Sequence, residues 1–359
     1  GDQDLWTRMV DQVRAASEKT GKDLRIYMDL PGPKIRIEFP LGITTLPVQK
    51  GMHIELHKGP VDPVEFEMAI RNSDPQTPIP VTLSIPEVVG MLEVGEKVFF
   101  DDGMIRGVVT ETGAHTALIR ILKSFKEKLK PDKGMNLPET LLNLPSLTPQ
   151  DREHLPFVVG HADLLGYSFV KNESDVSLLY ELLQACGDKK PGVVFKIENL
   201  NAFNRLPLIL LEGMKYDRIG VMIARGDLAV ELGFDRISEV QNEILWLCEA
   251  AHVPVIWATQ VLDNLAKRGI ATRAEISDAA LSIRSECVML NKGRYILDAI
   301  SELRTILHRM ESHSSKNKNA LRPLQIAKKN LERLDRSRPS GSREEVPGRE
   351  SGQRGFSDN

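Results

Sequence analysis

The strongest constraint in this chain is a pair of apolar segments, each of which runs directly into charged residues. Residues 193–199 read VVFKIEN, and residues 218–227 read RIGVMIARGD. Continuous apolar runs of this kind are typical of strands that are buried on both faces of a parallel sheet. In parallel α/β folds the carboxyl ends of the strands face the functional site. We therefore interpret the charged residues at these two ends as parts of one site, and not as surface ion pairs beside two buried strands.

The charged residues at these strand ends suit a divalent cation and an anion. Glu198 and Asp227 are expected to face one another, and a pair of carboxylates with few other ligands suits Mg²⁺ or Mn²⁺, which prefer oxygen donors. Lys196 would place a positive charge beside that ion. Gly226 lets the backbone come close to a ligand, and the amides of Gly226 and Asp227 are expected to open a short helix that receives an anion.

The second half of the chain alternates regularly between strand and helix patterns. Strands are predicted at 164–170, 193–197, 218–223, 253–258 and 287–290, and helices near 150–160, 174–186, 237–251 and 274–284. This alternation predicts a parallel sheet in an α/β fold. Residues 24–30 add a sixth strand after an amphipathic helix over 4–19. A last helix is predicted over 296–310, with one apolar face formed by Leu297, Ile300, Leu303, Ile306 and Leu307.

Residues 37–138 have a different texture, with short β-rich segments between turn residues. Strands are predicted at 43–48, 53–56, 80–83, 97–100, 105–110 and 116–122. Short strands with Gly and Pro between them predict a small barrel or sandwich, inserted after the strand at 24–30. Asp101, Asp102 and Gly103 are expected to form a turn.

Composition excludes several classes of protein. A formal charge of −3 over 359 residues, with 5% aromatic residues, does not indicate a nucleic-acid or membrane partner. The sequence contains no run of about 18 apolar residues, which a membrane span would require. The three cysteines are widely spaced, which argues against a disulfide framework or a zinc site. A cytoplasmic location is the default expectation.

Several motifs, in a fixed order, resemble those of pyruvate kinases. Besides KIEN at 196–199 and ARGDL at 224–228, the chain contains MDLPGPKIR at 28–36, FDDG at 100–103, KGMNLP at 133–138, SFV at 168–170, ATQ at 258–260 and TRAE at 272–275. The chain is similar to a divergent, bacterial-type member of that family.

The resemblance implies a TIM-type (β/α)8 barrel whose first two strands are missing here, with an inserted small all-β lid domain. It suggests that the sequence is N-terminally truncated, lacks the family's C-terminal regulatory domain and is poorly stable alone, because an open sheet edge remains. The implied domains are barrel segment 1–36, β-rich lid 37–138, remainder of the barrel 139–311 and disordered basic tail 312–359, in which a weak helix is predicted over Leu324–Leu334.

The resemblance also implies a chemistry, namely phosphoryl transfer from phosphoenolpyruvate to ADP with Mg²⁺, giving pyruvate and ATP. Lys196 and Thr259 would be catalytic, and Glu198 and Asp227 would bind the metal. Phosphoenolpyruvate would contact Lys196, Gly226, Asp227 and Thr259. A buried threonine that only bonds to backbone is the alternative at 259. The implied assembly is a homo-oligomer.

Nucleotide and monovalent-cation positions follow from the same resemblance. Arg36 and Lys133 would contact nucleotide phosphates. Asp29 lies where the family binds a monovalent cation, and Lys34 replaces the Glu that most potassium-dependent members have. Because a lysine supplies a positive charge itself, we expect K⁺ not to be required.

The chain departs from the family at Asn291-Lys292-Gly293, where pyruvate kinases usually have Ser-Gly-Glu-Thr. Two alternatives to a kinase remain, of which this departure and the missing N-terminal strands motivate only the first. One is a noncatalytic pyruvate kinase-like protein that binds phosphoenolpyruvate or a partner. The other is a Mg²⁺-dependent lyase that handles an enolate without nucleotide, which would need neither Arg36 nor Lys133.

Overall fold

The structure, a computed structural model, describes residues 3–72, 74, 76–187, 190–314, 326, 329 and 330. Residues 1–321 form one compact unit, which contains every element discussed below, and residues 322–359 form a second unit. The helix predicted over Leu324–Leu334 and the disorder predicted for the tail beyond residue 314 fall almost entirely outside the described residues. Within them, helix α10 (Ile296–Ser314) runs into the first residues of that predicted tail.

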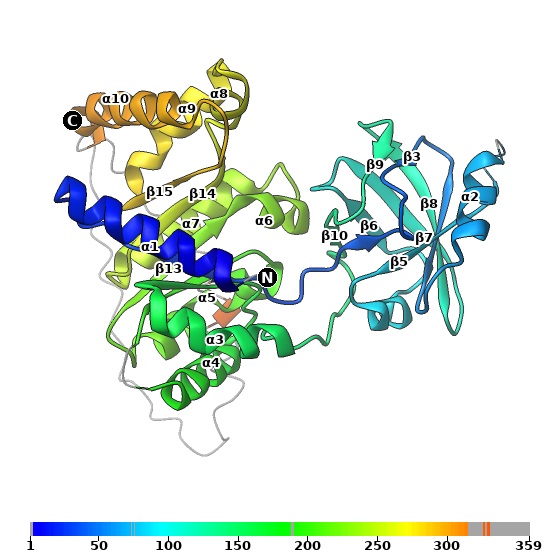
Figure 1. Cartoon of the computed structure of the whole chain (residues 1–359), viewed down its shortest axis with the longest axis horizontal. Coiled ribbons are helices and arrows are strands. Elements are labelled where there is room, and N and C mark those ends of the chain that lie inside the picture. The colour runs from blue at the N-terminus through cyan, green and yellow to red at the C-terminus, as the bar shows by residue number, and fades with distance from the viewer. Residues whose placement is uncertain are drawn as a thin grey trace, which may run out of the picture. The chain divides into compact units, whose positions relative to one another are not determined.

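A six-stranded parallel sheet is the framework of the α/β part of the chain (Figure 1). Its strands lie in the order in which they occur in the sequence: β1 (Tyr27–Leu30), β11 (Leu164–Tyr167), β12 (Gly192–Ile197), β13 (Ile219–Ala224), β14 (Val255–Val261) and β15 (Cys287–Leu290). Every neighbouring pair is parallel. The predicted α/β fold and the six predicted strand positions are confirmed, with shifts of one to three residues at their ends.

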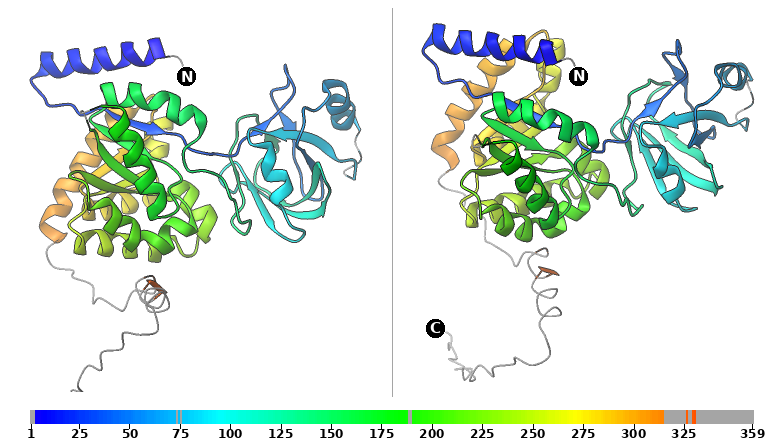
Figure 2. Two further views of the ribbon diagram at one scale, coloured as in Figure 1. Left: turned by 90° about the horizontal axis from the view of Figure 1, so that it is seen from below. Right: turned by 60° about the horizontal axis from the view of Figure 1, so that its bottom comes forward.

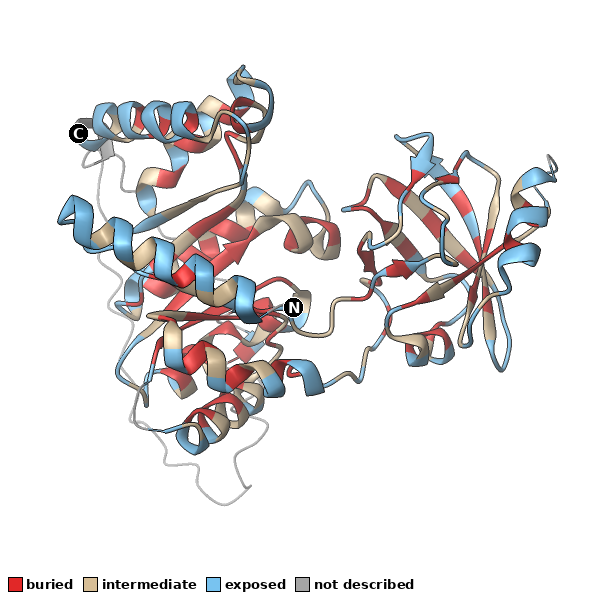
Figure 3. Ribbon diagram, in the orientation of Figure 1, coloured by how far each residue is buried: buried red, intermediate tan, exposed pale blue. Residues whose placement is uncertain are grey.

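The central strands β12 and β13 are buried on both faces, as their continuous apolar runs predict, whereas the edge strands β1 and β15 are partly exposed. Val194, Met222 and Ala258 form a cluster on one face. The opposite face packs against helices, because the Phe195 ring lies against Gly213 at the end of α5 (Leu200–Gly213). Figures 1 and 2 show the helices α3 (Pro149–His161), α4 (Glu173–Ala185), α5 and α7 (Ile237–Ala250) outside the curved sheet, and Figure 3 shows the strands as the most buried part.

Two capping boxes fix the starts of helices in this part. Thr148 accepts a hydrogen bond from the Asp151 amide, and the Asp151 carboxylate accepts one from the Thr148 amide. Thr272 and Glu275 form the same reciprocal pair at the start of α9 (Arg273–Leu281). The first of these boxes shows that Asp can serve in place of the usual Glu or Gln. The helices α5 and α8 (Asp263–Arg268) were not predicted.

The β-rich part of the chain contains a seven-stranded, mostly antiparallel sheet. Its order is β10 (Met135–Asn136), β6 (Lys97–Phe100), β7 (Ile105–Thr112), β8 (Thr116–Ser124), β4 (His53–His57), β5 (Ile79–Leu83) and β2 (Ile37–Glu38), and β3 (Leu46–Pro47) pairs with β9 (Lys128–Leu129). β4 and β5 are parallel and are joined by α2 (Pro63–Arg71). A separate apolar core fills this part.

Two peripheral helices bury only part of their apolar side chains, and in α1 only Val10 is buried. In α1 (Gln3–Thr20), Trp6 packs edge-on against His154 of α3 with ring centroids 5.0 Å apart. In α10, Ala299, Leu303 and Ile306 are buried, but Leu297 and Ile300 are 77% and 50% exposed. The predicted apolar face of that helix is therefore wrong in part, because the helix turns only the side that carries Ala299 toward α8 and α9. None of the helices in the described ranges has the length and apolar character that a membrane span requires.

Substitution of Gly213 tests whether the packing of α5 against the sheet outweighs intrinsic helix propensity. A Cβ at residue 213 would lie 2.6 Å from Cε2 of Phe195, a ring that is fully buried. We expect Gly213→Ala to lower the free energy of unfolding by about 1–3 kcal/mol through overpacking, although alanine favours helices. Gly160 in α3 is the control, since a Cβ there meets open space. Gly160→Ala should raise the stability by up to about 1 kcal/mol, and urea unfolding of both variants measures the two signs.

Candidate active site

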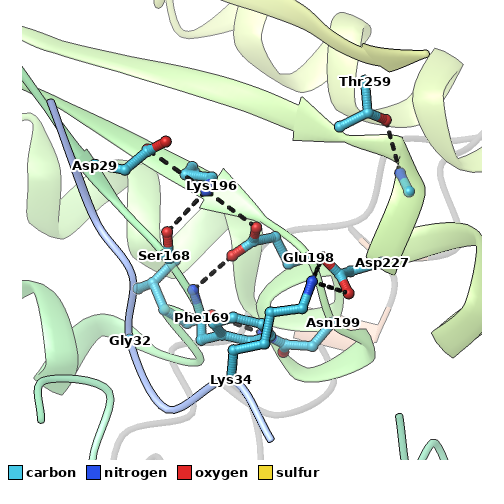
Figure 4. Close-up of polar contacts among 12 residues, drawn as sticks. Asp29, Gly32, Lys34, Ser168, Phe169, Lys196, Glu198, Asn199, Asp227 and Thr259 are labelled. Atoms are coloured by element: carbon cyan, nitrogen blue, oxygen red, sulfur yellow. Dashed lines mark hydrogen bonds and ion pairs between the residues drawn. The ribbon is translucent and has the colours of Figure 1, made fainter. Parts of the chain in front are cut away.

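Polar side chains gather where the sheet strands β11, β12, β13 and β14 end (Figure 4). Ser168 follows β11, Lys196 and Glu198 lie at the end of β12, Asp227 follows β13, and Thr259 lies near the end of β14. The parallel sheet brings these ends to one edge, as the sequence pattern predicts.

Lys196 is the centre of the first group of contacts. Its Nζ donates to Ser168 Oγ at 2.8 Å and lies 3.2 Å from Glu198 Oε1 and 3.5 Å from Asp29 Oδ1. Its side chain is only 14% exposed. Burial lowers the pKa of Lys196, but the charges of Glu198 and Asp29 outweigh this effect and raise the pKa above its ordinary value. The ammonium is therefore charged at neutral pH.

Glu198 is almost fully buried, at 4% exposure. Its Oε2 accepts a hydrogen bond of 2.7 Å from the backbone amide of Phe169, which has a left-handed backbone with φ of 53°. Burial raises the pKa of Glu198 and the charge of Asp227 raises it further, against the opposing effect of Lys196. The two carboxylates are thus close enough to interact, and burial is the main reason why the pKa of Glu198 is raised.

Asp227 is held from two other parts of the chain. Lys34 Nζ donates to both Oδ1 and Oδ2 at 3.0 Å, and Asn136 Nδ2 donates to Oδ1 at 3.3 Å. Asn136 lies on β10, the strand by which the chain returns from the β-rich part. Its Oδ1 is buried and has no hydrogen-bond partner in the described part of the chain.

These groups fit a hydrated divalent cation. Among the described residues no cluster of three or more His, Cys, Asp and Glu side chains could hold a metal alone. Two carboxylates that the strand ends bring together nevertheless match Mg²⁺, which keeps several waters and takes oxygens from its substrate. Figure 4 shows Glu198 and Asp227 converging on one region, with Lys196 on one side and Lys34 on the other.

Thr259 adds a hydroxyl to the start of α6 (Arg225–Leu232). Its Oγ1 accepts a hydrogen bond of 2.8 Å from the Gly226 amide. A hydroxyl that accepts here still has its own proton to donate. Thr259 has φ of 65°, a left-handed conformation that is an outlier for a β-branched residue. The predicted short helix opening at Gly226 and Asp227 is present.

The residues predicted to contact nucleotide or a monovalent cation pair with protein groups in this structure. Lys133 Nζ lies 2.9 Å from Asp101 Oδ1 in the 101–103 turn. Arg36 Nη1 donates to the Asp132 carbonyl at 2.7 Å. Asp29 contacts Lys196 and accepts a hydrogen bond of 2.9 Å from Tyr27, whereas Lys34 contacts Asp227. Asp29 and Lys34 thus pair with different side chains, and their role toward a monovalent cation stays a prediction.

A pocket of about 240 Å³ adjoins Asp227. Its lining comes from the segments around residues 33–35 and 135–144, from the strand-end residues Phe169, Lys171 and Asn199, and from Asp227 and Glu231 of α6. The site thus has a partly open space beside Asp227 that can receive a small molecule.

Comparison with known proteins agrees with the geometry. A family model described as "Pyruvate kinase, barrel domain" matches residues 1–300. The chain is 31% identical over 314 residues to a pyruvate kinase of Staphylococcus saprophyticus and 30% identical over 318 residues to one of Geobacillus stearothermophilus, which covers 85% and 87% of this chain. The chain belongs to the pyruvate kinase family. It spans about half the length of these two relatives, 50% and 51%. A pyruvate kinase of Mycobacterium tuberculosis is 29% identical over 88% of this chain and 64% of its own length.

The structure adds three residues to the site that the sequence prediction did not name. Ser168 contacts Lys196, Asn136 contacts Asp227, and Glu231 lies one helical turn after Asp227 in α6. Ser168 and Asn136 occur within the SFV and KGMNLP motifs, so their positions carried a signal. Glu231 could have been found from its i, i+4 spacing on a helix that starts at Arg225.

The segment that departs from the usual pyruvate kinase pattern packs against α8. Asn291 Nδ2 donates to Asp263 Oδ1 at 2.9 Å. A Cβ at residue 293 would lie 2.1 Å from the Ala266 carbonyl oxygen, so only glycine fits this close approach. The shortened segment is therefore a tightly packed connection between β15 and α10.

Glu231 provides a pH-dependent test of the site. Burial and the charge of Asp227 raise its pKa from 4.5 to about 7, although Asn136 opposes this. Between pH 4.5 and about pH 7 the folded chain keeps the proton on the Glu231 carboxyl, whereas the unfolded chain releases it. The free energy of unfolding therefore falls as pH rises through this window. Glu231→Gln removes the ionisation. We expect the variant to gain up to about 3 kcal/mol relative to the parent between pH 4.5 and pH 8, as measured by urea unfolding without divalent metal. A difference that does not change with pH would contradict the shift.

Proposed function

We propose that this chain carries the catalytic centre of a pyruvate kinase, which transfers a phosphoryl group from phosphoenolpyruvate to ADP. The observation that supports this most directly is the arrangement of Lys196, Glu198 and Asp227 at the ends of β12 and β13. Phosphoryl transfer needs little covalent chemistry from the protein, because positioning and charge neutralisation supply most of the catalysis. A buried ammonium beside two carboxylates and an anion site suits that requirement.

Each residue has a role that its contacts make chemically reasonable. Lys196 is charged and buried, so its ammonium would stabilise the moving phosphoryl group and the enolate left behind. The amides at Gly226 and Asp227, with the Thr259 hydroxyl, would orient the substrate carboxylate. Thr259 would then assist delivery of a proton to the methylene carbon of the enolate. Glu198 and Asp227 would hold Mg²⁺, which when bound supplies positive charge to the phosphate and carboxylate oxygens.

The nucleotide would be bound from the β-rich side. Arg36 and Lys133 flank the two connections of the β-rich part, and we propose that both contact nucleotide phosphates in the closed enzyme. This requires Lys133 to exchange its ion pair with Asp101 for a phosphate. Closure of such a lid excludes water from the transferred group. The Asp101–Gly103 turn already lies near α6, since a Cβ at residue 103 would be 3.5 Å from the Phe234 ring.

The finer architecture follows from the same proposal. We propose that the six parallel strands are part of an eight-stranded (β/α) barrel and that residues 37–138 act as its lid. Domain limits at 36, 138 and 311, a cytoplasmic location and a homo-oligomeric state belong to the same proposal.

A coupled assay tests the proposed function on this chain. ATP and pyruvate should both form when phosphoenolpyruvate, ADP and Mg²⁺ are present. Lys196→Met and Glu198→Gln should each lower kcat by at least about 10²-fold, because each removes a buried charge that faces the reacting group. Lys215→Met is the control, since Lys215 is 64% exposed and pairs with Glu212 away from the site. It should leave kcat unchanged.

The two alternative functions give different results in that assay. Pyruvate release without ADP would identify an enolate lyase. Binding of phosphoenolpyruvate without turnover would identify a noncatalytic binding protein, which is the alternative that the departure at 291–293 suggests. Formation of both products with the control but not with the two site variants would exclude both alternatives.

Potassium dependence is a separate test of Lys34. Because its ammonium already neutralises Asp227, we expect the rate to stay unchanged when Na⁺ is replaced by K⁺ at constant ionic strength. Lys34→Glu removes that charge and adds a negative one. This variant should require K⁺ for activity. A large activation of the parent chain by K⁺ would show that Lys34 does not replace the monovalent cation.

A further inference from the structure

Thr259 keeps a backbone conformation that it would not adopt without support. Its φ of 65° is followed by 58° at Gln260 and 50° at Leu262, and the pairing of β14 with β15 shifts register in this segment. Such conformations cost about 1–3 kcal/mol each and persist only where surrounding contacts hold them. The conformation brings the Thr259 hydroxyl to the Gly226 amide. The groups that hold it therefore control where that hydroxyl points.

Arg225 supplies those contacts. Its Nε donates to the Ala258 carbonyl at 2.8 Å, and its Nη2 donates to the Thr259 carbonyl at 2.7 Å. These are the carbonyls on either side of the Thr259 Cα. The guanidinium also lies over the buried Trp257 ring, 4.7 Å from its centroid. One planar group thus fixes both peptide units that flank Thr259.

Asp278 on α9 fixes the guanidinium itself. Its Oδ2 accepts from Arg225 Nη2 at 2.9 Å, and its Oδ1 pairs with Nη1. The Arg225 side chain is 13% exposed. Bidentate pairing sets the plane of an arginine in a way that a lysine cannot reproduce, because an ammonium has no rigid fork. The α9 helix is in turn held by the Thr272–Glu275 capping box.

We infer that Arg225 and Asp278 are positioning residues for Thr259, which they hold in its left-handed conformation so that its hydroxyl faces the anion site at Gly226 and Asp227. Neither side chain needs to touch substrate. This inference rests on the proposed function in assigning Thr259 to proton delivery. The contacts of Arg225 with Asp278 and with the Ala258 and Thr259 carbonyls, called the clamp below, are a property of the chain itself. A purely structural ion pair would instead affect stability without a selective effect on that step.

Proton exchange into pyruvate isolates the step that Thr259 is proposed to assist. With Mg²⁺ and ATP in deuterated water, loss of the pyruvate methyl signal in proton NMR measures the exchange rate. Arg225→Lys and Asp278→Asn should lower this rate by about 10- to 100-fold, since a misplacement of about 1 Å costs that much. The KM for phosphoenolpyruvate should change far less. Arg205→Lys is the matched control, because Arg205 makes a similar bidentate pair with Glu173 between α5 and α4.

A double-mutant cycle decides whether Arg225 acts through Thr259. Thr259→Val removes the hydroxyl with little change in shape. In that background Arg225→Lys should cause no further loss of exchange, because the group that it positions is already absent. Losses that multiply in the double variant, or an equal loss in Arg205→Lys, would overturn the inference.

Hydrogen–deuterium exchange of the backbone keeps the inference separate from the proposed function. If the parent chain neither exchanges pyruvate protons nor phosphorylates ADP, the proposed function fails, and the clamp is then tested alone. Arg225→Lys should accelerate amide exchange in peptides that cover residues 255–262 and leave those covering β12 unchanged. Unchanged exchange at 255–262, or acceleration throughout the sheet, would contradict the clamp.

Discussion

A buried carboxylate, that of Glu198, is the constraint on which the arrangement of the site depends. An isolated carboxylate at 4% exposure would be too costly to keep ionised, so the fold must place compensating groups beside it. The chain does so with the Lys196 ammonium and with the amide of Phe169, which adopts a left-handed backbone to point its N–H at Oε2. These contacts tie the end of β11 to the end of β12. Asp227 adds a second carboxylate nearby, which raises the pKa of Glu198 further and is itself paired with Lys34.

Asp227 extends the same network to distant parts of the sequence. Its partners Lys34 and Asn136 are 193 and 91 positions away in the chain, one on each connection between the β-rich part and the parallel sheet. The site is therefore complete only when these connections are in place. Thr259 and its clamp add a third long-range element, since Asp278 reaches Arg225 from α9 across 53 positions. Geometry at this edge of the sheet is thus a property of the whole unit and not of any one motif.

The parts of this architecture that could be predicted from the sequence are those with local causes. Strands β12 and β13 were readable because an apolar run is followed at once by charge, and Lys196 and Glu198 are neighbours on a single strand end. Helix α2 was missed although Asp62 caps it and Pro63 starts it, a signal that was available. The contact of Lys34 with Asp227 could not be predicted, because it depends on how the 31–36 segment crosses the sheet edge. The left-handed backbone at Thr259 likewise depends on Arg225, whose side-chain direction no local pattern specifies.

The bidentate contact of Lys34 with Asp227 also sets the conditions under which any ion can enter. A cation that takes these two oxygens has to displace a competitor that is covalently attached to the same chain. Such a tethered competitor acts at a fixed effective concentration, which dilution cannot lower. Monovalent salt in solution is then a weak rival for the carboxylate, whereas a small divalent ion, with twice the charge, has an advantage. Lys34 in this way makes the site selective for cations of high charge density.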